Sequence, residues 1–121
     1  MAVVLVVDDE FGLAKLLADV LADEGHHVLI ATNGQQALER ASKQRPSLVL
    51  TDFVMPVMDG AALMKAMAAD PALSEVPVVV MSSSPEAVVA ERCRGYVAFV
   101  RKPFKCFDVV ALVATLCRPK S

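Results

Sequence analysis

The chain has 121 residues, a formal net charge of −2 at pH 7 and 55% hydrophobic residues, but only 5% aromatic residues and no tryptophan. This length allows one domain with a real core, and the apolar content excludes a disordered chain. The near-neutral charge gives no electrostatic reason to expect nucleic acid or an anionic membrane as a partner, and the longest apolar run, residues 1–7, is too short to span a bilayer.

Short apolar runs rich in β-branched residues have the composition of strands that are buried on both faces. In chain order they cover residues 2–7, 27–31, 47–51, 77–81 and 97–100. The first run is followed by acidic residues and has no basic segment before it, which excludes a secretory signal. The runs therefore predict five internal strands.

Stretches with helical spacing separate the strands. The first stretch places its large apolar residues on one face, namely Leu13, Leu16, Leu17, Val20 and Leu21. Gly25 follows at the position where a residue in the left-handed conformation ends a helix. The second helix begins after Asn33 and Gly34 and ends before Pro46.

Three further helices are predicted towards the carboxyl end. One covers about residues 60–69 and stops before Pro71. The next begins around Pro85, which is placed at the first helical position. The last follows Pro103 and reaches about Cys117.

The predicted elements alternate strictly between strand and helix. Such alternation with apolar strands predicts a parallel sheet with helices on both faces, a three-layer α/β fold. Five strands fit the doubly wound, flavodoxin-like order 2-1-3-4-5, in which a switch point lies beside the first and third strands. Ligands of such sheets bind at this point, outside the carboxyl ends of the strands.

Acidic residues follow the two strands that flank the switch point. Asp8 and Asp9 come after the first strand, and Asp52 comes after the third. Their like charges would repel, which favours a raised pKa or a bound cation. An all-oxygen site with few protein ligands suits Mg²⁺, which keeps several waters and binds phosphate oxygens. Lys102 and Ser82 follow the fifth and fourth strands, and at this edge their charge and hydroxyl suit a phosphoryl group.

Each of these residues, taken alone, has a simpler explanation. Aspartate and serine after a strand most often cap a helix or form a turn. This explanation does not account for the crowding of several like-charged acids at adjacent strand ends. The acids also argue against a flavin or dinucleotide binder, because such proteins cradle phosphate on a loop rich in glycine or hydroxyl groups. No G-x-G-x-x-G or Walker A pattern occurs in the sequence.

Four motifs together resemble the receiver domain of two-component response regulators, the CheY-like family. They are VVDDE at residues 6–10, TDFVMPVMDG at residues 51–60, PVVVMS at residues 77–82 and KPF at residues 102–104. The resemblance covers essentially the whole chain, so one receiver domain is expected over residues 1–121.

The resemblance implies a phosphorylation site. Asp52 would accept a phosphoryl group from a phosphohistidine of a sensor histidine kinase or phosphotransfer protein, or from a small donor such as acetyl phosphate. Asp9, Asp52 and the backbone carbonyl of Val54 would bind Mg²⁺ directly, and Asp8 would hold a metal-bound water. Lys102 would contact the phosphoryl group.

The resemblance also implies a switch. Ser82 would bind a phosphoryl oxygen, and Phe99 would turn inward to fill the space that Ser82 leaves. The alternative for Phe99 is plain core packing. The bond between Lys102 and Pro103 is expected to be cis. The segment between Ser82 and Phe99 is shorter than is usual in the family, which predicts a short fourth helix.

The last predicted helix carries more apolar residues than one buried face requires. Its two apolar stripes are Val109, Val113 and Leu116, and Phe107, Val110, Ala114 and Cys117. The second stripe predicts docking of a downstream protein or a second copy through the face formed by the fourth and fifth helices and the fifth strand. Neither nucleic acid nor a membrane is expected as a partner.

Three functions remain open. The first is a signalling switch that acts on no separate substrate and loses its phosphoryl group slowly, because Val54 has no polar side chain to orient water. The second is an interaction scaffold with the same fold that does not use the site. The third is a small hydrolase or phosphotransferase with an aspartyl-phosphate intermediate, which would need an acid two residues past the nucleophile, where Val54 stands. Three cysteines at no metal-ligand spacing favour reduced thiols and a cytoplasmic location.

Overall fold

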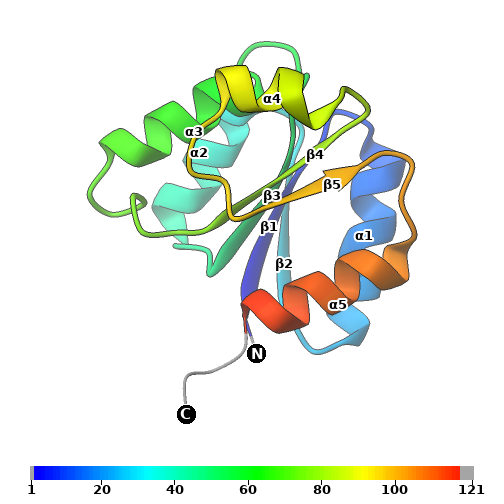
Figure 1. The fold of residues 1–121 in the computed structure, drawn as a ribbon. Helices are drawn as coiled ribbons and strands as arrows, with labels where there is room; N and C mark the ends of the chain where they lie inside the picture. The colour runs from blue at the N-terminus through cyan, green and yellow to red at the C-terminus, as the bar shows by residue number, and fades with distance from the viewer. Residues whose placement is uncertain (1, 118–121) are drawn as a thin grey trace.

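Five parallel strands form one sheet in the order β2-β1-β3-β4-β5 in the computed structural model, which describes residues 2–117 (Figure 1). The strands are β1 (Val3–Val7), β2 (His27–Ala31), β3 (Leu48–Asp52), β4 (Val78–Ser82) and β5 (Ala98–Arg101). The helices are α1 (Phe11–Asp23), α2 (Gly34–Lys43), α3 (Gly60–Ala69), α4 (Glu86–Arg92) and α5 (Cys106–Leu116). The predicted fold is confirmed; the predicted domain, 1–121, extends at both ends beyond the described residues.

The helices cover both faces of the sheet and create two cores. Alternate residues of one strand enter different cores, so that Leu5 packs with α2, α3 and α4 while Val4 packs with α1 and α5. This double burial explains why the strands read as continuous apolar runs rather than as alternating patterns.

The central strands are buried more completely than the edge of the sheet at β5. All residues of β3 and β4 are buried, whereas β5 is half-buried and ends in an exposed residue. The helix beside it, α4, has seven residues, and only Val89 among them is buried. A short fourth helix was expected, and the structure confirms it.

Several strand and helix ends differ from the prediction by one residue. Strands β3, β4 and β5 each begin and end one residue later, because backbone hydrogen bonds continue past their last apolar residue: the Phe53 N–H donates to the Met81 carbonyl at 3.0 Å. Pro85 is the residue before α4 rather than its first helical residue, since its ψ of 147° is extended. Gly25 does adopt the left-handed conformation, with φ of 92°, just after α1.

The predicted apolar face of α1 was wrong in one respect. Its buried residues are Ala14, Leu17, Ala18 and Leu21, whereas Leu16 is 51% exposed. The helix is therefore rotated relative to the prediction, with its small alanines against the sheet. Leu16 instead lies beside the functional site described below. Within residues 2–117, no helix is long and apolar enough to cross a membrane.

Candidate functional site

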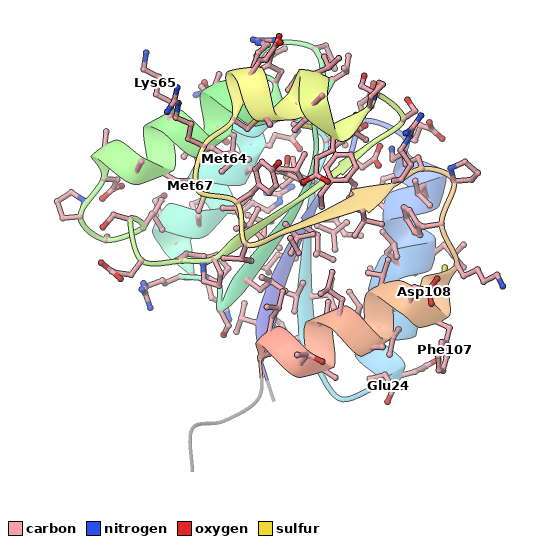
Figure 2. The ribbon with its side chains drawn as sticks, viewed as in Figure 1. Glu24, Met64, Lys65, Met67, Phe107 and Asp108 are labelled. Atoms are coloured by element: carbon pink, nitrogen blue, oxygen red, sulfur yellow. The ribbon has the colours of Figure 1, made fainter. Side chains whose placement is uncertain are left out.

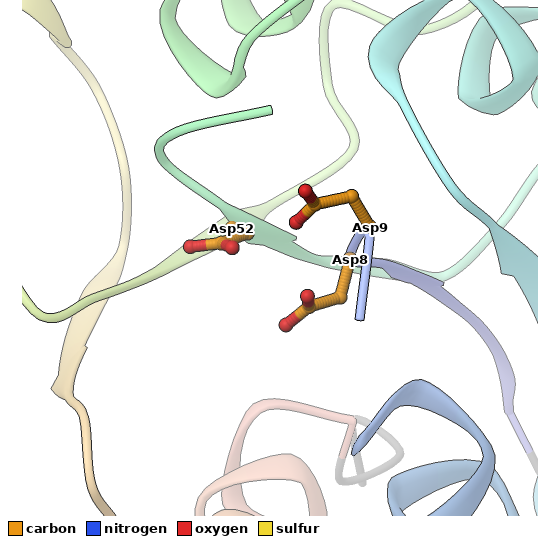
Figure 3. Close-up of side chains that lie close together, drawn as sticks. All are labelled: Asp8, Asp9 and Asp52. Carbon is orange, nitrogen blue, oxygen red and sulfur yellow. The ribbon is translucent and has the colours of Figure 1, made fainter. Parts of the chain in front are cut away.

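Three carboxylates converge at the carboxyl end of the sheet. Asp52 is the last residue of β3, and Asp8 and Asp9 directly follow β1, its neighbour in the sheet. Carboxylate oxygens of the three residues lie within 4.8 Å of one another (Figure 3). The crossing point of the doubly wound topology thus brings together residues that are more than forty positions apart in sequence.

The backbone holds Asp8 in a fixed position. Its N–H donates to the Ala31 carbonyl at 3.0 Å and so continues the ladder between β1 and β2. Its carboxylate is fully buried and accepts the N–H of Glu10 at 2.9 Å. Asp9, the next residue, is exposed, so the site has one buried and one open acid on this side.

Lys102 connects the two strands through their acids. Its Nζ donates to Asp8 Oδ2 at 2.9 Å and to Asp52 Oδ2 at 3.2 Å. The other carboxylate oxygen of Asp52, Oδ1, accepts the N–H of Phe53 at 2.9 Å. One partly buried cation therefore serves two buried carboxylates, with a third carboxylate nearby.

The charges of this cluster perturb its ionisation. Burial raises the pKa of Asp52 above its ordinary value, the negative charge of Asp8 raises it further, and Lys102 offsets only part of this effect. Burial alone would lower the pKa of Lys102, but the hydrogen bond to Asp8 and the charge of Asp52 outweigh it, and the pKa is raised. The site thus has an excess of negative charge that a cation would relieve.

The donor atoms at this edge fit a hard divalent cation. Among the described residues, the side-chain donors that converge, from Asp8, Asp9 and Asp52, are carboxylate oxygens, without the histidine or cysteine that zinc prefers. Few protein oxygens and an open side match Mg²⁺, which retains waters and takes phosphate oxygens as ligands. The backbone carbonyl of Val54, predicted as a further ligand, belongs to the loop that directly follows Asp52.

Ser82 lies at the same edge, at the end of β4. Its side chain is 2% exposed, and its Oγ accepts the N–H of Ser84 at 2.9 Å. Ser82, Asp52 and Lys102 line one open pocket of about 530 Å³, together with Leu13 and Leu16 of α1 and other residues. The pocket is large enough for a phosphoryl group and part of its donor.

The segment after β5 places Lys102 at this pocket. The Lys102 N–H donates to the Ser82 carbonyl at 2.8 Å, which continues the pairing of β4 with β5. The bond between Lys102 and Pro103 is cis, as expected.

Phe99 lies outside the pocket. It is half-buried on β5, packs against the core beneath α2, α3 and α4, and its ring centre is 6.5 Å from that of Tyr96. The Tyr96 hydroxyl donates to Glu86 Oε2 at 3.0 Å on α4. In register, Phe99 pairs with Val80, two residues before Ser82. The contact between Phe99 and Tyr96 and the hydrogen bond from Tyr96 to Glu86 therefore connect β5 with α4.

The loop between β3 and α3 is pressed against the acceptor strand. A Cβ on Gly60 would lie 2.5 Å from the backbone oxygen of Asp52, and the Gly60 N–H donates to the Phe53 carbonyl at 3.0 Å. Asp59 caps α3 by accepting the N–H of Ala62 at 2.9 Å. Glycine at position 60 is thus required by close packing against Asp52.

Arg92 is a residue near this loop that the sequence did not indicate. Its Nη2 lies 3.1 Å from Asp59 Oδ2, and its guanidinium lies 5.5 Å from the centre of the Phe53 ring. These contacts join the last turn of α4 to the loop that follows Asp52. The partners are 33 and 39 positions away in sequence, so no local pattern could have revealed them.

Comparison with known proteins gives a consistent result. The sequence model described as "Response regulator receiver domain" matches residues 4–114. The DNA-binding response regulator MtrA of Mycolicibacterium paratuberculosis is 36% identical over 117 residues, which are 95% of this chain and 51% of that protein. The chain spans about half the length of the curated relatives it matches.

Solved structures of similar chains have the same fold over nearly the whole length. The signal receiver domain of a signal transduction histidine kinase from Syntrophus aciditrophicus has a TM-score of 0.86 at 31% identity, covering 100% of this chain and 96% of that one. The chemotaxis response regulator CheY4 of Vibrio cholerae has a TM-score of 0.87 at 29% identity, covering 96% and 98%.

Proposed function

The chain belongs to the family of response regulator receiver domains, which are signalling domains of two-component systems, and we propose that it is switched by a phosphoryl group on Asp52. We assign the whole chain, 1–121, to this one domain. The observation that carries the proposal is the contact of Lys102 with both Asp8 and Asp52 beside an open pocket.

Asp52 is suited to be the nucleophile. Its carboxylate lines the pocket and is 12% exposed, so a donor can reach it, and its Oδ1 is oriented by the Phe53 N–H. A carboxylate oxygen would attack the phosphorus of a phosphohistidine. The phosphorus–nitrogen bond would break, the imidazole nitrogen would keep the electron pair and take up a proton, and Asp52 would become an acyl phosphate.

The other residues of the pocket would stabilise the transferred group. Lys102 carries a positive charge beside Asp52, and phosphoryl transfer is catalysed chiefly by such positioning and charge neutralisation. The hydroxyl of Ser82 would donate to a phosphoryl oxygen. Asp8, Asp9, Asp52 and the carbonyl of Val54 would hold Mg²⁺, whose positive charge would offset the repulsion between the carboxylates and the phosphoryl oxygens.

A phosphodonor partner would dock beside the pocket. Leu16 and Phe11 are exposed on α1, and Leu16, Leu13 and Phe104 form an apolar margin of the pocket. We propose that a sensor histidine kinase or a phosphotransfer protein in the cytoplasm covers this margin when it presents its phosphohistidine. The exposure of Leu16, unexpected from its helical position, supports such a use.

The output would lie at the face formed by α4, β5 and α5. Movement of Ser82 towards a phosphoryl group would allow Phe99 to turn inward, which would change this face. On α5, Val109 and Val113 are buried, whereas Phe107 of the second stripe is 78% exposed. A downstream protein or a second copy could cover it.

Nucleic acid and membranes are not proposed as partners of these residues. MtrA is named a DNA-binding response regulator, but this chain spans only about half of that protein. The proposal of no nucleic-acid contact therefore concerns the receiver domain alone.

The domain would act on no substrate besides its own Asp52, and it would lose the phosphoryl group slowly. Val54 is 65% exposed next to the acceptor and offers neither acid nor base to an attacking water. The same residue counts against a hydrolase. An unphosphorylated scaffold is not favoured, since each residue that the family uses is in place.

Intact mass spectrometry tests the proposal. The protein is incubated with acetyl phosphate with and without Mg²⁺, and one phosphate adduct is expected with Mg²⁺ only. The variant Asp52→Asn should give no adduct, and Asp23→Asn, an exposed aspartate on α1, should behave as the parent protein. Absence of an adduct with acetyl phosphate and with phosphorylated histidine kinases would favour the scaffold.

A further inference from the structure

A second cavity lies away from the phosphorylation site, between α3 and the end of α4. It is an open groove of about 510 Å³. Its floor is formed by Ala61, Ala62, Met64 and Ala68 of α3 and by Cys93, which follows α4. None of these residues belongs to the acidic site or to the α4–β5–α5 face discussed above.

Positive charge surrounds this apolar floor. All charged residues that line the groove are cations, namely Lys65, Arg92 and Arg94. Of these three cations, only Arg92 has an ion-pair partner within residues 2–117, namely Asp59, and Lys65 and Arg94 have none there. Lys65 extends outward from α3, while the neighbouring Met64 and Met67 point into the core (Figure 2). The chain as a whole is slightly acidic, so this concentration of unpaired cations is local.

We propose that the groove docks an acidic, amphipathic helix of a partner protein. Positive flanks on an alanine floor are complementary to a helix that carries small apolar residues on one stripe and carboxylates on both sides. The lining residues 61, 64, 65 and 68 are three or four positions apart and so lie on one face of α3. The alanines among them are small enough to permit close approach of a second helix. Within the part of the chain that the structure describes, no strand residue lines the groove, so an extended peptide would find no strand edge there to pair with.

Arg92 would couple the occupancy of the groove to the phosphorylation site. The same guanidinium lines the groove, pairs with Asp59 and lies over the ring of Phe53, the residue after Asp52. A carboxylate in the groove would compete with Asp59 for Arg92. Binding would therefore change the environment of Phe53, and by linkage a change at Asp52 would alter binding. Docking would occur with or without a phosphoryl group on Asp52, and phosphorylation would change only its affinity.

Amide NMR with a defined probe tests the proposal. The probe is a synthetic helical peptide with alanine and leucine on one stripe and glutamate on its flanks, and the matched peptide has glutamine in place of glutamate. The acidic peptide is expected to shift the amide signals of residues 61–68 and 92–94 and of Phe53. The glutamine peptide should bind at least fivefold more weakly, and salt at about 0.5 M should abolish the difference.

Variants locate the site. Lys65→Glu and Arg94→Glu should each weaken binding about fivefold, the effect expected for one exposed ion pair. Lys43→Glu, at an exposed lysine of α2, should leave it unchanged. In Arg92→Ala, the shift at Phe53 should disappear while the shifts on α3 remain. Asp52→Asn should still bind, which separates this proposal from that of phosphorylation.

Other outcomes would overturn the proposal. They are equal binding of both peptides, shifts confined to other faces, or equal weakening by Lys43→Glu. If ADP shifted the same amide signals and bound with higher affinity than the peptide, the groove would be assigned to a small anion. Shifts that followed protein concentration alone would assign it to a second copy.

Discussion

The centre of the sheet and its β5 edge are built differently. Strands β3 and β4 are buried throughout, and backbone hydrogen bonds continue at their ends, from the Phe53 N–H to the Met81 carbonyl and from the Lys102 N–H to the Ser82 carbonyl. At the edge, β5 is half-buried and α4 contributes only Val89 to the core. The first region offers fixed positions for charged groups, and the second has few contacts that oppose movement.

This difference suits a switch. Phosphoryl transfer requires an acceptor and a cation in fixed geometry, which a rigid central sheet supplies. Propagation of the conformational change requires a region with a second conformation of only slightly higher free energy, which the loosely packed edge supplies. The following experiments test this division, from the largest expected effect to the smallest.

Loss of the partly buried Lys102 cation should have the largest effect. Lys102→Met leaves the buried carboxylates of Asp8 and Asp52 without a counter-charge and should destabilise the fold by about 3 kcal/mol at pH 7 without metal. Lys15→Met breaks a shorter contact, 2.6 Å to Asp19, but both side chains are more than half exposed, so less than about 0.5 kcal/mol is expected. Urea unfolding measures both; equal losses would contradict the account.

Packing of the acceptor loop comes next. Gly60→Ala places a Cβ 2.5 Å from the Asp52 backbone oxygen and should cost about 2 kcal/mol, with displacement of the acceptor. Gly12→Ala is the matched control on α1, since, apart from its chain neighbours and its own helix backbone, no atom of the described residues lies within 4 Å of the new Cβ. It should stabilise the protein by about 0.5 kcal/mol. Thermal unfolding measures the change in stability of both variants relative to the parent protein. If Gly60→Ala left the stability unchanged, the close contact with Asp52 would be refuted.

The charge on Asp52 should make stability depend on pH. Its pKa in the folded protein is raised above 3.8, so its contribution is fully present below pH 3.8 and is lost as the pH rises through the raised pKa. Asp52→Asn removes this loss and should be more stable than the parent at pH 7 in EDTA, but not at pH 3.5. Asp23→Asn, at an exposed aspartate of α1, is the control variant. A variant less stable than the parent at pH 7 would refute the raised pKa.

The smallest effect is expected at the edge. Arg92→Ala removes an exposed ion pair and a contact with Phe53, which should cost about 0.5 kcal/mol of global stability. Hydrogen exchange should nevertheless quicken at Val89 and Cys93, because α4 has few other anchors. The amide of Leu50 in β3 should not change. Faster exchange throughout β3 would show that centre and edge unfold together.

The fold and the acidic site were predictable because both depend on local patterns. The apolar runs identify buried strands, and the topology rule then places Asp8, Asp9, Asp52, Ser82 and Lys102 at one edge, where the structure has them. Each prediction needed only the neighbours of a residue in sequence and the order of the strands.

Contacts between distant segments were not predictable in this way. Helical spacing gives the residues of one face of α1 but not its rotation on the sheet, so the exposure of Leu16 was missed. The contacts of Arg92 with Asp59 and Phe53 depend on where α4 ends in space. The positive φ of Val57, 68°, likewise follows from the loop as a whole, since a β-branched residue disfavours it.

Chemical mapping of the phosphorylated residue tests the central claim most directly. After treatment with acetyl phosphate and Mg²⁺, hydroxylamine should convert an acyl phosphate into a hydroxamate, which peptide mass spectrometry can locate. The account predicts the hydroxamate at Asp52 alone, and none after Asp52→Asn. A hydroxamate at Asp8 or Asp9, or a phosphoryl group that resists hydroxylamine, would contradict it.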